Sequence, residues 1–204
     1  MLITAIRQSS PDRLTVSLDD GREIKSTLGT VTELRLFSGR DVDEELIAEL
    51  ISLSRRSIAR DRAIEMLSRR RMSRHELIKK LTDKGEDEET AIFCADWLEE
   101  KGFLDDASYA AAVARHYVAK GYGAGRVKAE LSRRGVEKEL WEGALESMPE
   151  TESKIDKFIA SRLKDPEDRD ELRKLSAALY RRGFSWEEIR SALRRYNART
   201  EELE

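Results

Sequence analysis

Two adjacent carboxylates and two histidines are the residues of this chain whose types could support acid–base chemistry. Asp105 and Asp106 could act as a general acid and a general base, and His75 or His116 could transfer a proton. Adjacent residues at a helix start diverge by roughly 100°, so the two aspartates point apart, whereas helix capping uses such side chains directly. The histidines lie near no nucleophile motif and fit no metal-binding spacing. We therefore expect no catalytic residue, and we interpret Asp105 and Asp106 as helix caps.

A glycine-rich stretch from Gly121 to Gly125 could in principle cradle a phosphate. It joins two helical patterns and lacks the following Gly-Lys-Ser/Thr of a nucleotide-binding loop, so it predicts a helix break. Cys94 is the only cysteine, which excludes an intramolecular disulfide and a cysteine metal cluster and fits a reducing, cytoplasmic setting. The apolar run at residues 1–6 is too short for a signal peptide or a membrane span. We expect no cofactor, no metal and no membrane contact.

Basic side chains are the remaining candidates, and they occur in bands. Residues 55–80 carry ten Lys or Arg against three Asp or Glu, residues 81–108 carry two against ten, and the alternation continues under a net charge of −3. These bands are either solvated helix faces or a surface that meets a partner of mixed charge, or phosphates. The candidate partner-binding residues are Arg126, Lys128, Arg133, Arg134, Arg181 and Arg182.

Two short helices must position most of these residues. Asp105 and Asp106 start the first helix, and Tyr109, Val113 and Tyr117 draw an apolar stripe along it. Gly121 and Gly123 stop that helix. The second helix turns Val127 and Leu131 inward, and Gly135 follows its end.

Three sequence words in this stretch occur in order: GFLDDASY (102–109), KGYGAGRVKAEL (120–131) and RRGV (133–136). Together they resemble the central part of the RecX family, bacterial regulators of the recombinase RecA, and the resemblance covers most of residues 57–196. Family members often carry proline where this chain has Ala124, which loses a helix-start residue without removing the break. The family-motif residues, which we interpret as structural, are Asp105, Asp106, Tyr109, Gly121 and Gly123.

The composition predicts a mainly α protein. Charged residues make up 39% of the chain, against about 25% in ordinary globular proteins, and there are only three prolines. Residues 2–7 and 13–18 alternate apolar and polar side chains and predict a β-hairpin, which residues 22–25 could extend as a third strand. A helical segment around residues 32–37 could cover this small N-terminal sheet.

A repeat of about 50 residues organises the helical part. Gly85, Gly135 and Gly183 each follow a leucine by four positions, and apolar pairs recur six and ten residues beyond each glycine. We therefore predict three tandem three-helix, helix-turn-helix-like repeats in an elongated array. The expected parts are an N-terminal β region with a short helix (1–42), a linking helix with the first repeat (43–102), the second repeat (103–149), and the third repeat with a tail that frays from Ala198 (150–204).

Residues 43–71 follow a helical pattern that no proline or glycine interrupts. The serines at 52, 54 and 57 mark the expected place for a bend or break, which leaves one helix or two as alternatives. Ser73 to Glu76 then match a capping box that starts a new helix.

Three classes of function fit these features. A sequence-specific helix-turn-helix regulator could use the basic second helices at 126–134 and 173–182 on DNA, and a helical scaffold could join unrelated proteins. The RecX resemblance implies a third class, in which the repeats settle into the groove of the RecA–DNA filament and restrain filament growth, ATP hydrolysis and strand exchange without catalysis. We expect this third function, with roles in recombination, DNA repair and the SOS response, weak DNA contacts, and a cytoplasmic monomer.

Overall fold

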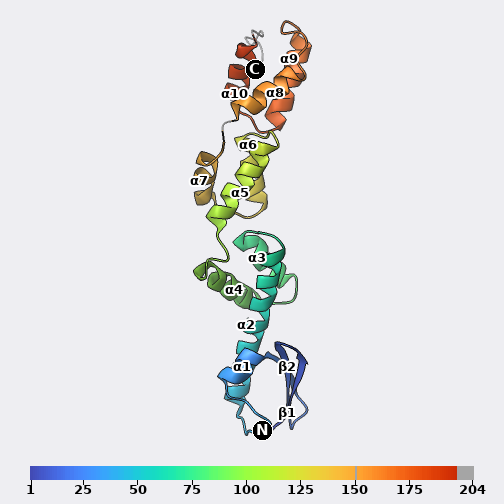
Figure 1. Cartoon of the computed structure of the whole chain (residues 1–204), viewed down its shortest axis with the longest axis vertical. Coiled ribbons are helices and arrows are strands. Elements are labelled where there is room, and N and C mark those ends of the chain that lie inside the picture. Colours follow the sequence, from blue (N-terminus) through green and yellow to red (C-terminus); the bar gives the residue numbers. More distant parts are fainter. Residues whose placement is uncertain (150, 197–204) are drawn as a thin grey trace. The chain divides into compact units, whose positions relative to one another are not determined.

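The computed structural model describes residues 1–149 and 151–196, and these are mainly helical (Figure 1). The chain divides into two compact units. The first comprises Met1–Arg71 with Glu76–Leu104, and the second comprises Met72–His75 with the chain from Asp105 onward. The fraying expected from Ala198 concerns residues outside the described part.

The first unit begins with a three-stranded antiparallel sheet in the order β1-β2-β3. Leu14, Val16 and Leu18 alternate with less buried residues along the middle strand, so one face of the sheet packs on a core. The predicted hairpin and third strand are confirmed. The bounds are β1 (Ile3–Ser10), β2 (Arg13–Leu18) and β3 (Glu23–Thr27).

Helix α1 (Leu28–Glu33) follows β3 directly, so the helix expected at 32–37 was misplaced. The Thr27 hydroxyl accepts a hydrogen bond from the Thr30 N–H at 3.2 Å and starts the helix early. Arg35 then adopts a left-handed conformation at φ 52°, and this ends the helical path. Val31 and Leu36 still pack into the core under the sheet, so the segment covers the sheet as expected.

Helix α2 (Glu44–Arg69) is continuous over 26 residues, so the helical pattern of residues 43–71 forms one helix and the chain does not break at the serines. Ser54 is 1% exposed, and its Oγ lies 2.8 Å from the Oγ of Ser26 on β3. One turn further, the Ser57 Oγ lies 3.0 Å from the Thr27 Oγ1. These small hydroxyl side chains let the helix approach β3 closely while their polar groups are satisfied, so they dock the helix on the sheet without breaking it.

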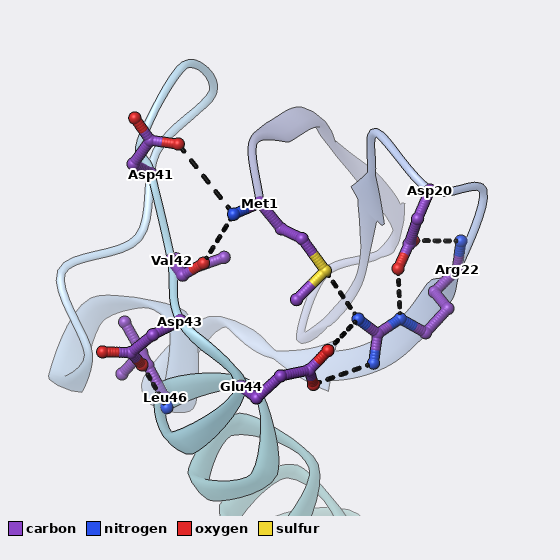
Figure 2. Close-up of polar contacts among 8 residues, drawn as sticks. All are labelled: Met1, Asp20, Arg22, Asp41, Val42, Asp43, Glu44 and Leu46. Carbon is purple, nitrogen blue, oxygen red and sulfur yellow. Dashed lines mark hydrogen bonds and ion pairs between the residues drawn. The ribbon is translucent and has the colours of Figure 1, made fainter.

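Arg22 ties the turn between β2 and β3 to the first turn of α2 (Figure 2). Its Nε donates to Asp20 at 2.6 Å, and its terminal nitrogens donate to Glu44 at 2.9 and 3.2 Å. The backbone N–H of Arg22 also donates to Asp20, and these contacts hold the pKa of Asp20 below its usual range. Asp43 caps α2 by accepting from the Leu46 N–H at 2.8 Å.

The first three-helix domain combines the second half of α2 with α3 (Arg74–Thr82) and α4 (Glu88–Glu100). Ala91 and Ala95, the positions six and ten residues beyond Gly85, are fully buried as predicted. Burial also raises the pKa of the Cys94 thiol to about 11, so this thiol is unreactive at neutral pH.

The second unit contains two further three-helix domains with separate cores. The predicted inward positions Val127 and Leu131, and Ile189 and Leu193 of the last helix, are buried. The prediction of three three-helix domains with a small N-terminal sheet is therefore confirmed. The bounds are α5 (Asp106–Ala119), α6 (Ala124–Arg133), the 3₁₀ helix η1 (Lys138–Leu140), α7 (Trp141–Glu146), α8 (Glu152–Ala160), α9 (Arg169–Arg181) and α10 (Trp186–Arg195).

The buried Ser26–Ser54 pair generates a stability prediction. Ser54→Ala or Ser26→Ala removes one hydroxyl and weakens satisfaction of the other, so each should lower the free energy of unfolding by about 1–3 kcal/mol. The double variant should lower the free energy of unfolding by less than the sum of the two single effects, because neither hydroxyl is then buried without its partner. Urea unfolding measures all three variants. Ser52→Ala, an exposed site on the same helix, is the control, and strict additivity would show that the pair does not interact.

Candidate partner-binding surface

Asp105 and Asp106 bind backbone groups of two different helices. The Asp105 carboxylate accepts from the Ser108 N–H at 2.8 Å and caps α5, as predicted. The Asp106 carboxylate instead accepts from the N–H of Arg74, the first residue of α3, also at 2.8 Å. The expectation that both cap α5 is therefore corrected. Each carboxylate meets a helix N-terminus, where the helix dipole favours negative charge.

A buried carboxylate, Glu130, organises the basic residues of α6, and sequence reasoning missed it. Glu130 is 5% exposed. Its oxygens lie 2.8 Å from Arg133, 3.4 Å from Arg134 and 3.8 Å from Arg126. The signal was present, because these arginines stand three or four positions from Glu130 and so share its side of the helix.

The arginines keep Glu130 ionised. Hydrogen bonds from Arg133 lower its pKa to about 2, burial opposes this effect, and a hydrogen bond from Tyr117 reinforces it. An unpaired carboxylate in such a buried place would instead have a raised pKa. Glu130 is therefore a fixed negative charge at the centre of a positive group.

This arrangement changes the basic surface expected from the sequence. Arg134 has only 20% of its side chain exposed, and its guanidinium donates to the hydroxyl of the buried Tyr109. Arg134 is thus a packing residue, and the expectation that it is an exposed contact is wrong. Arg126 and Arg133 remain 47% and 66% exposed while paired with Glu130, and Lys128 is exposed.

The predicted break after α5 is a docking point for the third domain. The N–H of Gly123 donates to the Arg182 carbonyl at 3.0 Å, and that of Gly125 donates to the Gly183 carbonyl at 2.9 Å. A Cβ at Gly123 would lie 2.5 Å from the Gly183 oxygen, and one at Gly183 would lie 2.1 Å from the Arg126 nitrogen. Both positions therefore require glycine. The N–H groups that a phosphate would need are occupied by carbonyls.

Arg182 belongs to this joint. The sequence had suggested that Arg182 lies on an open contact surface, and the structure corrects this. The Nη1 of Arg182 donates to the Gly121 carbonyl at 3.2 Å, and its guanidinium stacks over the rings of Tyr122 and Phe158 at 5.4 and 4.4 Å. Arg181, the neighbouring residue, is exposed.

The turn at Gly135 makes a close contact of the same kind with the start of α3. The Ser73 hydroxyl donates to the Arg134 carbonyl, and a Cβ at Gly135 would lie 2.3 Å from the His75 ring. His75 is therefore a packing residue, and the ring of His116 meets that of Tyr117 edge-on at 5.6 Å. By contrast, a Cβ at Gly85 would meet nothing within 4 Å. The Arg-Arg-Gly word thus marks the two turns, at Gly135 and Gly183, that contact the middle helix of the preceding repeat. The start of α3 packs on the turn at Gly135, and the start of α6 packs on the turn at Gly183.

Other kinds of site are not visible in the described part of the chain. Residues 1–149 and 151–196 contain no group of three or more His, Cys, Asp or Glu side chains that could hold a metal ion. None of the helices described is long and apolar enough to cross a membrane. Together, the fold and these joints define a tandem array of three-helix domains that presents basic side chains on its surface.

Comparisons with known proteins identify the family. Models of the first, second and third three-helix domains of RecX match residues 59–92, 105–145 and 157–193. The regulatory protein RecX of Vibrio vulnificus is 37% identical over 66% of this chain and 90% of its own length. That of Caldanaerobacter subterraneus subsp. tengcongensis is 28% identical over 95% of this chain and 98% of its own. The chain belongs to the RecX family.

Solved structures agree with this fold. A crystal structure of a regulatory protein RecX matches 95% of this chain with a TM-score of 0.74 at 22% identity. That of RecX from Lactobacillus salivarius matches 70% with a TM-score of 0.62 at 21% identity.

The glycine joint predicts different costs for one substitution at two glycines. Gly183 and Gly85 have φ angles of 88° and 93°, so alanine meets similar backbone strain at both, about 1–2 kcal/mol. Only Gly183→Ala also overlaps the Arg126 backbone, which should cost at least about 2 kcal/mol more. Urea unfolding followed by amide exchange in α9 and α10 measures the difference. Equal losses for both variants would contradict the joint.

The Glu130 cluster predicts a pH dependence. The Glu130 pKa falls from 4.5 to about 2 on folding, so its contribution to stability is complete above pH 4.5 and is lost as the pH falls toward 2. Glu130→Gln should lower the free energy of unfolding by about 3 kcal/mol at pH 7. Glu130→Gln should also reduce the fall in the free energy of unfolding between pH 5 and pH 2. Glu137→Gln, an exposed change in the same domain, is the control, and parallel pH profiles for wild type and Glu130→Gln would refute the assignment.

Proposed function

We propose that this protein binds the RecA–DNA filament and restrains RecA activity, which lowers ATP hydrolysis, filament growth and strand exchange. Membership of the RecX family carries this proposal, through the matches of all three helical domains. The protein would thereby act in recombination, DNA repair and the SOS response. Such a partner would place it in the cytoplasm.

The exposed basic residues of the second unit are the proposed contact points. Lys128 and Arg133 on α6 and Arg181 at the end of α9 are exposed, and Arg126 is half-exposed beside them. Arg133 is also oriented by Glu130 before any partner binds. Its side chain therefore loses less conformational entropy on binding. We assign no contact role to Arg134 and Arg182, because both are used in packing.

Repetition would add affinity to this contact. A filament presents the same protomer surface many times, and a chain of linked domains can engage neighbouring protomers together. Weak contacts of the basic residues with filament phosphates would contribute a salt-dependent part. The protein would act as a monomer and without catalysis, since binding alone restrains the filament.

The structure disfavours the alternative, a sequence-specific helix-turn-helix regulator. The N-terminal end of α6, which would enter a major groove, is docked on the turn at Gly183. The first turn of α9 carries Asp170 and Glu171 after the Asp168 cap, and these charges would repel phosphates.

An ATPase assay tests the proposal. Excess protein should lower the DNA-dependent ATP hydrolysis of RecA and sediment with RecA filaments. The double variant Lys128→Glu, Arg181→Glu should weaken this inhibition about tenfold or more. Its helix content should be unchanged, because both side chains are exposed. Lys138→Glu, the reversal of one exposed charge in the second domain, is the control.

Two results would count against the proposal. Unchanged ATP hydrolysis at excess protein would contradict RecA regulation. If the protein instead bound one duplex sequence tightly, the helix-turn-helix alternative would be favoured.

A further inference from the structure

The turn at Gly85 has the same backbone geometry as the two turns that contact the preceding repeat. Gly85, Gly135 and Gly183 have φ angles of 93°, 65° and 88°. In all three turns the glycine N–H donates to the carbonyl three positions earlier, and the next N–H donates to the carbonyl of a leucine five positions before it. The three middle helices therefore end in one way, so the contacts of two turns indicate what the third can bind.

The turn at Gly85 is the one of the three that no described segment covers. At Gly135 and Gly183, turn carbonyls accept hydrogen bonds from the start of the preceding repeat's middle helix. The equivalent carbonyls at the first turn belong to Lys84 and Gly85, and no residue within 1–149 and 151–196 donates to either. Gly85 is also exposed, and a Cβ there would meet nothing within 4 Å. The array therefore has an open end at this turn.

The two covered turns show which kind of segment fits. Each receives the start of a helix, which supplies the Ser73 hydroxyl in one case and the N–H groups of Gly123 and Gly125 in the other. The N–H groups at a helix start have no partner within the helix, so they are ready donors. The approach is so close that a Cβ at Gly123 would lie 2.5 Å from the Gly183 oxygen. A helix start with glycine or serine at the contact meets these requirements.

A second copy of this chain does not offer such a start. By their distance from the turn glycine, Gly123 and Gly125 correspond to Glu171 and Arg173 of the third repeat. These long side chains would prevent the close approach, and the Glu171 N–H already donates to the Asp168 carboxylate at 3.2 Å. The starts of α3 and α6 are occupied within their own chain. The array is thus open at its first turn and closed at the start of α9.

Charge at the turn does not select the occupant. Asp83 and Lys84 are exposed neighbours of opposite sign, and the next carboxylate, Glu86, pairs with Arg62. The selection therefore depends on the backbone acceptors and on the space above Gly85, which a small residue can enter and a larger one cannot.

We propose that the turn at Gly85 receives the N-terminal turn of a helix from a partner protein, and that this helix carries glycine or serine where it meets the turn. The partner helix takes the place of a preceding repeat, and its N–H groups donate to the carbonyls of Lys84 and Gly85. The contact uses neither Lys128 nor Arg181, so it is independent of the proposed RecA contact.

A titration followed by nuclear magnetic resonance tests the site on the full, ¹⁵N-labelled chain. The probe is a synthetic peptide that copies residues 120–134, the helix start that docks on the turn at Gly183. The amide signals of residues 84–86 should shift on titration. A control peptide with Gly123→Ala and Gly125→Ala has the same charge and a higher helix propensity. It should bind about tenfold more weakly or worse, because its Cβ atoms block the close approach.

A variant of the turn provides a second readout. Gly85→Asn should weaken probe binding about tenfold or more, because its Cβ fills the space above the turn. Asparagine tolerates the left-handed conformation, so the turn itself should persist. Gly102→Asn is the matched control and should leave binding unchanged, since Gly102 also follows a helix of the same unit, has a φ of 72° and has open space around it. Thermal melting verifies that both variants are folded, and the peptide pair decides the question if Gly85→Asn is not.

Three results would overturn the proposal. The first is the absence of shifts at residues 84–86 with millimolar probe, and the second is equal binding of the alanine-substituted peptide. The third is a dimer in sedimentation velocity that Gly85→Asn dissociates, since this would assign the turn to a second copy of the chain.

Discussion

The close approach of Gly183 to Gly123 and Gly125 is the contact on which the second unit depends. Two backbone segments meet there at a separation that admits no Cβ, and their N–H and C=O groups satisfy one another. A direct backbone contact has little freedom to slide, because its donors and acceptors have fixed spacing. The joint therefore sets how α6 begins and where the turn after α9 lies.

The same constraint explains why the arginines of one sequence word have separate roles. Arg182 covers the joint and stacks between two aromatic rings, and Arg134 packs on Tyr109 in the equivalent turn. Arg181 and Arg133 precede them and point outward. A basic pair thus supplies one side chain to the joint and leaves the other at the surface, where it can meet a partner.

Glu130 links this packing to the electrostatics of the surface. Burial of one carboxylate would be costly alone, but three guanidinium groups compensate it. In return the carboxylate holds Arg126 and Arg133 in defined positions at the surface. In the N-terminal sheet, by contrast, small hydroxyl side chains dock α2 on β3. The edge of β3 beside the docked helix is left uncovered.

Local patterns in the sequence determined the elements: the alternation of β2, the stripe from Tyr109 to Tyr117, the cap at Asp105 and the glycine-ended repeats. Each depends on residues within one or two turns, so periodicity and capping preferences suffice to predict it. Only the tertiary structure decided the partner of Asp106, the burial of Glu130, the continuity of α2 and the packing of Arg134 and Arg182. These features depend on which distant backbone or side chain arrives beside the residue, because a polar group removed from water must find its partner wherever the fold places one.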